Sequence, residues 1–233
     1  MKLADLRPIE FLSSGIEAID ELIGGLPVGR LTEVYGSEGI GKSYLMAKIT
    51  AAATLQKQKV FFLDAEQAAN KDRMEALGVN LSLVDYSSVY ELEAASIEVL
   101  AAIPKHDLVI VDSIATLTPK NILDGELGEA NIGLYSRHMA KFVKKLKPAI
   151  SNSNCVFVAV NQYRKSPDMF APRYVPGGTA YMHALDLRLE LTTTPSKDKI
   201  VKDGERVGHW VTVKVTKSRL TKPHLSTRFK LMY

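Results

Sequence analysis

Cysteine is nearly absent from this chain. Its one cysteine, Cys155, lies inside an apolar run typical of a buried strand, so no disulfide framework can form. The chain also lacks the run of roughly 20 apolar residues that a membrane span needs. Charged residues among the first ten, including Lys2, Asp5 and Arg7, exclude a signal-peptide core. These absences predict a cytoplasmic protein with no membrane partner.

Histidine clusters and strong net charge are missing as well. The five histidines are scattered singly, without the spacing of a metal-binding motif. A net charge of +4 permits a polyanionic partner without requiring one. The 233 residues, 46% of them hydrophobic, are enough for one well-packed domain.

A glycine-rich loop decides which chemistry is open to the chain. Glycines let successive backbone N–H groups turn inward around phosphate oxygens, while Lys42 would reach the β- and γ-phosphates and Ser43 would contact Mg²⁺. A strand-like run at 31–35 precedes the loop and a helix-like run at 44–49 follows it, which favours triphosphate binding over an accidental glycine-rich turn. The loop residues are Gly36, Ser37, Glu38, Gly39, Ile40, Gly41, Lys42 and Ser43.

Apolar runs alternate with helix-period segments along most of the chain. This alternation is typical of parallel βαβ units, and after residue 184 it gives way to strands joined by polar turns. We therefore expect an α/β fold, with a mostly parallel sheet flanked by helices and a C-terminal antiparallel β extension. Strands are predicted at 31–35, 59–63, 82–86, 108–111, 155–160, 185–191, 210–215 and 225–231, and helices at 42–57, 67–77, 90–102 and 134–150.

Two predicted strands end in carboxylates. Asp112 follows four apolar residues, the arrangement that delivers a carboxylate to a phosphate-bound Mg²⁺, and Ser113 is expected near that ion's water shell. Asp64 and Glu66 follow the strand at 59–63, and Glu66 is our candidate for orienting or deprotonating the attacking water. The alternative is that Asp64 or Glu66 caps the following helix.

Gln162 ends another predicted strand, directly before a long connection. Its amide could sense the γ-phosphate and pass that signal into the connection. It could equally satisfy the backbone groups of a turn, and the residues alone leave the two interpretations open.

Two connections, at about 117–133 and 163–178, are long for a compact domain and follow core strands. The second mixes cations with aromatic residues, which is typical of phosphate contact combined with base stacking. Helix 134–150 places Arg137, Lys141 and Lys144 on one face, which predicts DNA contact or, alternatively, a solvated lysine face. The DNA candidates are Arg137, Lys144, Arg164, Lys165, Arg173, Gly177, Gly178 and Thr179.

Together these residues resemble the bacterial RecA recombinase core, from about Ser13 to Tyr233. The resemblance implies a RecA-like P-loop NTPase that binds ATP and Mg²⁺, with the metal at Ser43 and Asp112. It divides the chain into a short N-terminal segment, 1–25, and an ATPase core, 26–233. The matching segments are Gly24–Arg30, the phosphate loop, Asp64–Glu66, Val111–Lys120, Gly125–Gly128, Asn161–Arg164 and Gly177–Gly178.

The resemblance also assigns roles to single residues. It makes Glu66 the water-activating glutamate and Gln162 the γ-phosphate sensor, with Lys42 assisting at the phosphates. Loops 118–133 and 163–178 become two DNA loops. Lys217 and Arg219 would reach across a subunit boundary into a neighbour's ATP site. The remaining candidate nucleotide contacts are Tyr44, Arg73, which stands where relatives stack a tyrosine on adenine, and Tyr233, a second family aromatic.

The expected function is that of an ATP-dependent recombinase that binds single-stranded DNA, self-associates with ATP at the subunit interface, and hydrolyses ATP in response to DNA. The alternative is a recombination mediator that keeps the ATPase core but forms no filament. Longer relatives carry an N-terminal arm and a C-terminal DNA-gathering domain that the short flanks here do not match. The sequence therefore predicts neither filament assembly through that arm nor duplex capture by that domain.

Overall fold

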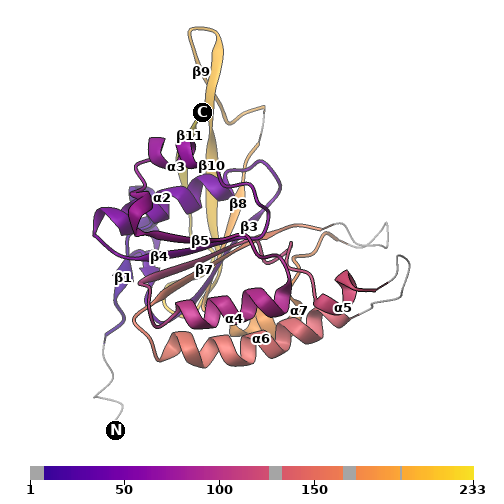
Figure 1. Ribbon diagram of the computed structural model, residues 1–233. Coiled ribbons are helices and arrows are strands. Elements are labelled where there is room, and N and C mark those ends of the chain that lie inside the picture. The colour runs from indigo at the N-terminus through magenta and orange to yellow at the C-terminus, as the bar shows by residue number, and fades with distance from the viewer. Residues whose placement is uncertain (1–7, 126–132, 165–171, 195) are drawn as a thin grey trace.

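The computed structural model describes residues 8–125, 133–164, 172–194 and 196–233. Over these ranges the chain forms a mostly parallel sheet with helices on both faces, and antiparallel strands continue it on one side (Figure 1). The predicted fold class is confirmed. In chain order the elements are β1 (Phe11–Leu12), α1 (Glu17–Ile23), β2 (Leu26–Pro27), β3 (Leu31–Gly36), α2 (Lys42–Leu55), β4 (Val60–Asp64), α3 (Lys71–Ala76), the 3₁₀ helix η2 (Leu81–Leu83), β5 (Val84–Ser87), α4 (Leu92–Ala102), β6 (Leu108–Asp112), α5 (Lys120–Leu123), α6 (Leu134–Ser151), β7 (Val156–Gln162), α7 (Gly178–Ala184), β8 (Leu187–Thr192), β9 (Lys199–Lys202), β10 (Glu205–Ser218) and β11 (Ser226–Met232).

The order of strands across the large sheet is β11-β10-β8-β3-β7-β6-β4-β5, and β9 pairs with β10. Strand β3 is parallel to both β7 and β8, whereas β10 is antiparallel to β8, β9 and β11. The expectation that residues 185–191 belong to the antiparallel extension was therefore wrong on one side of β8. The cause is α7, which carries the chain back across the sheet so that β8 can align with β3.

The register of the parallel strands brings their carboxyl ends to one edge. Gly36 at the end of β3 lies opposite Gln162 at the end of β7, and Asp64 at the end of β4 lies opposite Asp112 at the end of β6. Ligands of such sheets bind at this edge. Residues that are far apart in sequence are thus neighbours here.

Each face of the sheet carries its own apolar core. Alternate residues of a strand point to opposite faces, so Val158 packs with α2, on one face, while Phe157 packs with α6, on the other. Figure 1 shows α2 and α3 on one side of the sheet and α4, α6 and α7 on the other. Burial on both faces explains why the central strands consist almost entirely of apolar residues.

Some elements differ from the prediction. The helix predicted at 67–77 begins only at Lys71, because the Asp64 carboxylate accepts the N–H of Ala69 (2.8 Å) and Asn70 caps α3. Short elements α1, α7 and β9 lacked enough residues to show a period. Helix α1 lies in the segment 1–25, and its Ile19 and Ile23 pack in the same core as α2.

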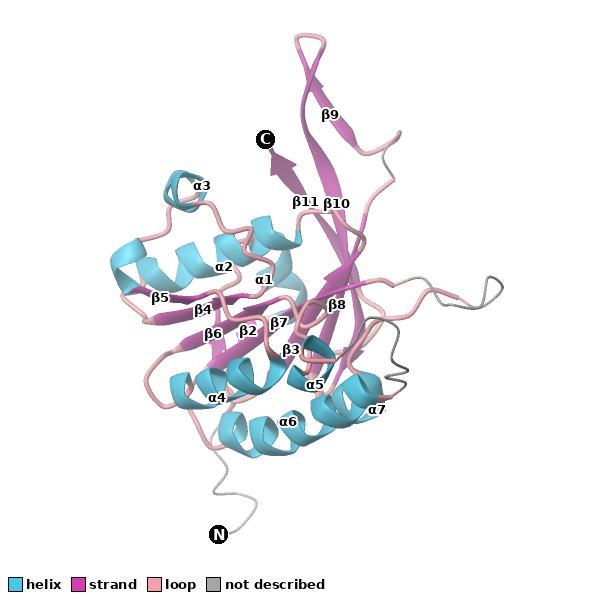
Figure 2. Ribbon diagram, turned by 45° about the vertical axis from the view of Figure 1, so that its right-hand side comes forward, coloured by secondary structure: helices cyan, strands magenta, loops and turns pink. Residues whose placement is uncertain are grey.

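Strands β9 and β10 form a hairpin that extends beyond the layered core (Figure 2). It is longer than the strand predicted at 210–215, because β10 runs from Glu205 to Ser218. Across the ranges that the structure describes, we find no helix with the length and apolar character of a membrane span.

Candidate nucleotide site

The phosphate loop joins β3 to α2 through a backbone that requires glycine. Gly41 has φ of 105° and lies at the N-terminus of α2, where a Cβ atom would come within 2.3 Å of Leu231 Cδ1. The Lys42 ammonium group donates to the carbonyl oxygens of Ser37 (2.7 Å) and Gly36 (3.3 Å). It is thus folded back over the loop that would surround a phosphate.

A cavity of about 390 Å³ opens beside this loop. It contains most of the predicted nucleotide contacts, although the side chains of Ser37 and Ile40 are not among those that line it. Ile40 is buried in the core, so its contribution to a bound phosphate would come from its backbone. The lining residues are Glu38, Gly39, Gly41, Lys42, Ser43, Tyr44, Glu66, Arg73, Asp112, Gln162, His209, Leu231 and Tyr233.

Burial lowers the pKa of Lys42, and the Asp112, Glu66 and Glu38 carboxylates oppose that shift. Asp112 is buried at the end of β6 and accepts a hydrogen bond from the Ser43 hydroxyl (3.3 Å). Burial raises the pKa of Asp112 to about 7, and the negative charges of Glu66 and Asp64 act in the same direction. A cation placed beside this carboxylate would stabilise its charged form.

The chemistry of Ser43 and Asp112 fits Mg²⁺. Magnesium prefers oxygen ligands and usually takes one or two from the protein and the rest from water and substrate phosphates. Across the described part of the chain, no group of three or more histidine, cysteine or carboxylate side chains could hold a metal by itself. The site therefore suits an ion that arrives with a triphosphate.

Glu66 is held by polar groups from two neighbouring strand ends. Its Oε1 accepts hydrogen bonds from Ser113 Oγ (2.6 Å), Gln162 Nε2 (2.5 Å) and, at longer range, Thr116 Oγ1 (3.4 Å). The helix-cap alternative was wrong for this residue, because Asn70 caps α3. Ser113 was expected near the metal's water shell, yet its buried hydroxyl positions Glu66 instead.

Asp64 has a structural environment. Its carboxylate accepts hydrogen bonds from the backbone N–H of Ala69 (2.8 Å) and the hydroxyl of Tyr86 (3.1 Å). These bonds fix the turn after β4. They leave Glu66, two residues further along, projecting into the cavity.

Asn161 and Gln162 point in different directions from the end of β7. Asn161 is buried and donates to Glu33 Oε1 (2.8 Å) and to the carbonyl of Pro176 (2.8 Å). Gln162 lines the cavity and contacts Glu66. The contact with a carboxylate, rather than with turn backbone, favours the sensor interpretation of Gln162.

Tyr44, Arg73 and Tyr233 line the cavity together with two residues that the sequence analysis missed, His209 and Leu231. His209 Nδ1 lies 3.1 Å from the Tyr233 hydroxyl. Extending the alternation of Val211, Val213 and Val215 by one step predicts that position 209 is buried on the same face, but not that it reaches the cavity.

Lys217 and Arg219 do not line the cavity of their own chain. Lys217 Nζ donates to the carbonyl of Met182 (2.7 Å), and Arg219 donates to the carbonyl of His183 (2.8 Å) and to Asp186 (3.3 Å). Burial and the charge of Arg219 lower the pKa of Lys217. Arg219 follows the end of β10, yet both cations meet at the C-terminal end of α7.

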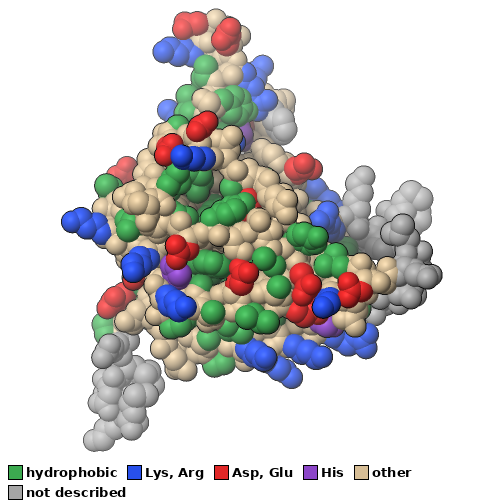
Figure 3. Space-filling model, viewed as in Figure 1, with side chains coloured by type: hydrophobic (Ala, Val, Ile, Leu, Met, Phe, Trp, Pro, Cys, Tyr) green, Lys and Arg blue, Asp and Glu red, His purple; other side chains and the backbone are tan. Residues whose placement is uncertain are grey.

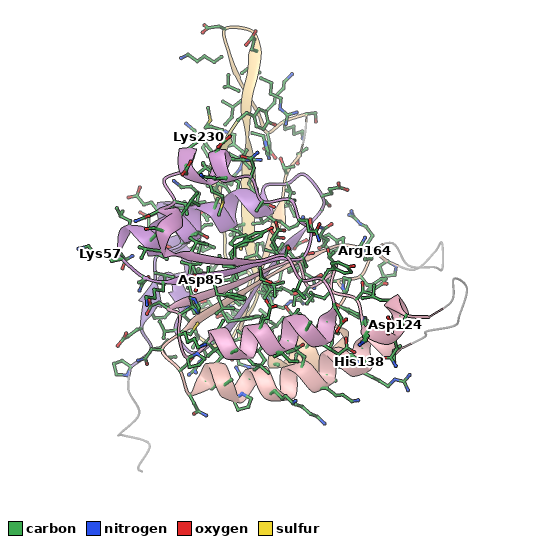
Figure 4. All side chains as sticks on the ribbon, in the orientation of Figure 1. Lys57, Asp85, Asp124, His138, Arg164 and Lys230 are labelled. Atoms are coloured by element: carbon green, nitrogen blue, oxygen red, sulfur yellow. The ribbon has the colours of Figure 1, made fainter. Side chains whose placement is uncertain are left out.

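Among the described DNA candidates, Arg137, Lys144, Arg164, Arg173 and Thr179 are exposed, whereas Gly178 is half-buried and Gly177 is buried. Arg137 and Lys144 are exposed on α6, and Figure 3 shows basic side chains gathered along the edge that α6 occupies in Figure 1. Arg164 is exposed, and Figure 4 labels it on the same side of the view as Asp124 and His138, with Lys57 on the other side. Lys165 lies outside the described residues.

The described ends of the second loop are close to each other. Arg164 and Tyr174 exchange backbone hydrogen bonds (2.8 and 3.0 Å), and the Arg173 guanidinium lies 5.0 Å from the centre of the Tyr163 ring. Gly177 and Gly178 have positive φ at the start of α7, and Thr179 is exposed in its first turn. The sheet thus brings this group near the nucleotide site, but not into it.

Comparison with known proteins agrees with this geometry. A family model described as RecA N-terminal domain matches residues 1–233. The protein RecA of Marinobacter nauticus is 36% identical over 242 aligned positions, which cover 100% of this chain and 69% of that protein. The protein RecA of Thioalkalivibrio sulfidiphilus is 35% identical, with coverage of 100% and 70%. The loop, strand-end carboxylates and sheet order described above are therefore those of a chain that belongs to the RecA family.

Proposed function

We propose that this chain is an ATP-dependent recombinase of RecA type that binds single-stranded DNA and hydrolyses ATP in response to it. One observation carries the proposal. Gln162 contacts Glu66 in the nucleotide cavity and is followed directly by the segment that leads to Arg164 and Arg173. A change at the γ-phosphate can therefore move the start of the second loop.

ATP would bind with its phosphates in the loop at 36–43. Lys42 would leave the carbonyls of Gly36 and Ser37 and pair with the β- and γ-phosphates, whose charge matches an ammonium group better than neutral carbonyls do. Glu66 would orient the attacking water in line with the γ-phosphate and accept its proton.

Ser43 and Asp112 would hold the magnesium ion, which neutralises charge that develops on the phosphate oxygens. Asp112 supplies the carboxylate and Ser43 the hydroxyl, from the end of β6 and the first turn of α2. With the ion bound, the carboxylate of Asp112 would be charged, because a nearby cation lowers the pKa of a carboxyl group.

The coupling to DNA would run through two contacts of the second loop. Gln162 contacts the water-orienting Glu66, and Arg164 donates to the carbonyl of Ala115 (3.4 Å), which precedes the first loop. When the γ-phosphate draws Gln162 away from Glu66, the start of the second loop would shift, and its contact with Ala115, just before the first loop, would shift with it. Nucleotide state would thereby set how both loops meet a DNA strand.

DNA would lie against the cations of α6 and of the second loop. Arg137, Lys144, Arg164, Lys165 and Arg173 would contact phosphates, and these contacts make affinity depend on salt. Backbone N–H groups of Gly177, Gly178 and Thr179 would bind a further phosphate.

ATP would sit between subunits of a homo-oligomer. Lys217 and Arg219 lie outside the cavity of their own chain and bind carbonyls at the C-terminal end of α7. They would complete the ATP site of a neighbouring subunit. Cations supplied in this way stabilise transition-state charge on the phosphates.

The direct test is Mg²⁺-dependent ATP hydrolysis with and without single strands. We expect single strands to raise the rate, Lys42→Ala to lose nucleotide-dependent DNA binding, and Arg164→Ala to weaken DNA binding with nucleotide affinity retained. Losing one phosphate contact should reduce the salt slope by about 0.7. Lys105→Ala is the matched control, because Lys105 is exposed at the amino end of β6, on the opposite edge of the sheet.

Hydrolysis that no DNA changes would refute the proposal. Microscopy with single strands and a slowly hydrolysed ATP analogue then separates a recombinase, which forms continuous filaments, from a mediator, which does not.

A further inference from the structure

A second cavity continues the nucleotide site away from the phosphate loop. It has a volume of about 550 Å³ and shares Tyr44, Arg73 and Tyr233 with the first. Its other lining residues are Ala76, Leu77 and Met232. It therefore lies between α3 and the end of β11, which Figure 1 shows near each other. A nucleoside whose phosphates occupy the loop would extend into this space.

Tyr233 forms a fixed platform at the boundary of the two cavities. Its backbone N–H donates to the carbonyl of Val207 (3.0 Å), and its hydroxyl lies 3.1 Å from His209 Nδ1. The Arg206 guanidinium lies 5.7 Å from the ring centre. The residue is nonetheless 70% exposed. An anchored aromatic ring with free surface is suited to stack on a base of any kind.

Arg73 supplies the polar group that faces this space from α3. It is exposed, and no carboxylate pairs with its guanidinium in the part of the chain that the structure describes. The amide oxygen of Asn70 is already used, because it accepts the backbone N–H of Arg73 (2.9 Å). The side chain that remains available to a base edge at this position is a donor of hydrogen bonds only.

This donor suits guanine. Guanine presents two adjacent acceptors, O6 and N7, which a guanidinium binds together, whereas adenine presents N7 beside an amino group that is itself a donor. No Asp, Glu, Asn or Gln side chain lines the second cavity, so no such acceptor among the described residues would read the amino group of adenine. Neither stacking on Tyr233 nor the apolar wall of Ala76 and Leu77 distinguishes the two purines.

We propose that the site accepts guanosine triphosphate as well as adenosine triphosphate, and that Arg73 is the residue that determines this. The inference rests on the proposed function, because it assumes that a triphosphate binds at the loop. It adds that the class of substrate is purine triphosphates rather than ATP alone.

The test is competition of Mg²⁺–ATP and Mg²⁺–GTP for a fluorescent nucleotide on the wild type and on Arg73→Ala. In the wild type we expect the two dissociation constants to agree within about tenfold. Loss of one bidentate contact should weaken GTP relative to ATP by about fivefold or more in Arg73→Ala. Lys71→Ala, which removes an exposed cation from the same helix, should leave the ratio unchanged.

Tight ATP binding with GTP more than about tenfold weaker in the wild type would overturn the inference and leave the proposed function standing. An unchanged ratio in Arg73→Ala would also overturn it. If neither nucleotide binds the wild type, the proposed function fails and the inference fails with it. If ATP binds and GTP does not, only the inference fails.

Discussion

The polar side chains at the edge of the parallel half of the sheet contact one another, whereas Lys217 and Arg219 of the antiparallel extension contact a helix, α7. At the parallel edge, Ser43 contacts Asp112, while Ser113 and Gln162 both contact Glu66. These groups come from the start of α2 and from separate strand ends, and they contact one another within one chain. At the end of β10, Lys217 and Arg219 bind carbonyls at the end of α7 and do not line the cavity.

The difference indicates which parts of nucleotide binding and hydrolysis one chain could carry out alone. The phosphate end of the cavity has in place its loop, the Ser43 and Asp112 oxygens proposed to hold the metal, and its candidate base. The cations that would stabilise transition-state charge are directed elsewhere. If Lys217 and Arg219 act as proposed, a protomer would bind a triphosphate by itself and would hydrolyse it rapidly only beside a second copy.

The largest expected effect is that of removing the Arg219 cation, which would leave the site of a neighbouring subunit incomplete. In Arg219→Ala we expect turnover of ATP in the presence of DNA to fall by about 10³-fold, while nucleotide affinity stays near that of the wild type, because a cation acting across a boundary stabilises the transition state. Steady-state hydrolysis and nucleotide titration measure the two quantities. Lys217→Ala should lower turnover in the same way.

Mixing experiments sharpen the same point. A Lys42→Ala subunit has an inactive site but an intact Arg219, so adding it to Arg219→Ala subunits should restore part of the turnover. Mixtures that stay as inactive as their components would show that Arg219 does not act on a neighbour. Thermal melting of Arg219→Ala controls for the lost contact with Asp186.

A smaller effect concerns stability at Asp112. Its pKa is raised from 3.8 to about 7 by burial and by the carboxylates of Glu66 and Asp64. The folded state therefore binds this proton more tightly than the unfolded chain does, and stability falls as pH rises from about 4 to about 7. In the presence of a chelator and without nucleotide, the free energy of unfolding of Asp112→Asn should exceed that of the wild type above pH 7 by on the order of 2–4 kcal/mol.

Urea unfolding from pH 5 to pH 8 measures this difference. Glu21→Gln, which neutralises an exposed carboxylate on α1, should follow the wild-type curve. The explanation fails if Asp112→Asn loses as much stability as the wild type across that window. Mg²⁺ and ATP together should reverse the advantage of the Asp112→Asn variant, because the charged carboxylate of the wild type then gains a cation that the neutral amide cannot attract as strongly.

The smallest expected effect is at Ser113, in the parallel half. Ser113→Ala removes the 2.6 Å hydrogen bond to Glu66 but touches neither loop nor metal oxygens. We expect the maximal rate to fall by about tenfold with nucleotide affinity unchanged, since Glu66 would lose orientation only. Thr116→Ala is the matched control, because its hydroxyl is 3.4 Å from Glu66 and should matter less. A changed affinity with an unchanged maximal rate would contradict a positioning role.

Much of the parallel half could be predicted because its signals are local. The phosphate loop lies between a strand and a helix in eight consecutive residues, and Asp112 directly follows its apolar strand. The helix start at Lys71 was missed, since it depends on Asp64 and Asn70 holding the preceding turn. Short helices such as α7 gave no periodic pattern to read.

The residues of the site that escaped prediction owe their positions to sheet order. His209 and Leu231 reach the cavity only because β10 and β11 continue the sheet beyond β8. Ser113 follows Asp112 in sequence, yet the pairing of β6 with β4 brings it to Glu66. No spacing along the chain encodes such a contact.

By itself, the sequence determined the alternation of strands and helices, the phosphate loop and the identity of the strand-end carboxylates, because these depend on neighbours within a few residues. The tertiary structure alone decided that β8 lies parallel to β3, that Ser113 serves Glu66, and that Lys217 and Arg219 turn toward α7. Those outcomes follow from which strands pair and in what register, and pairing joins residues that are distant in the chain.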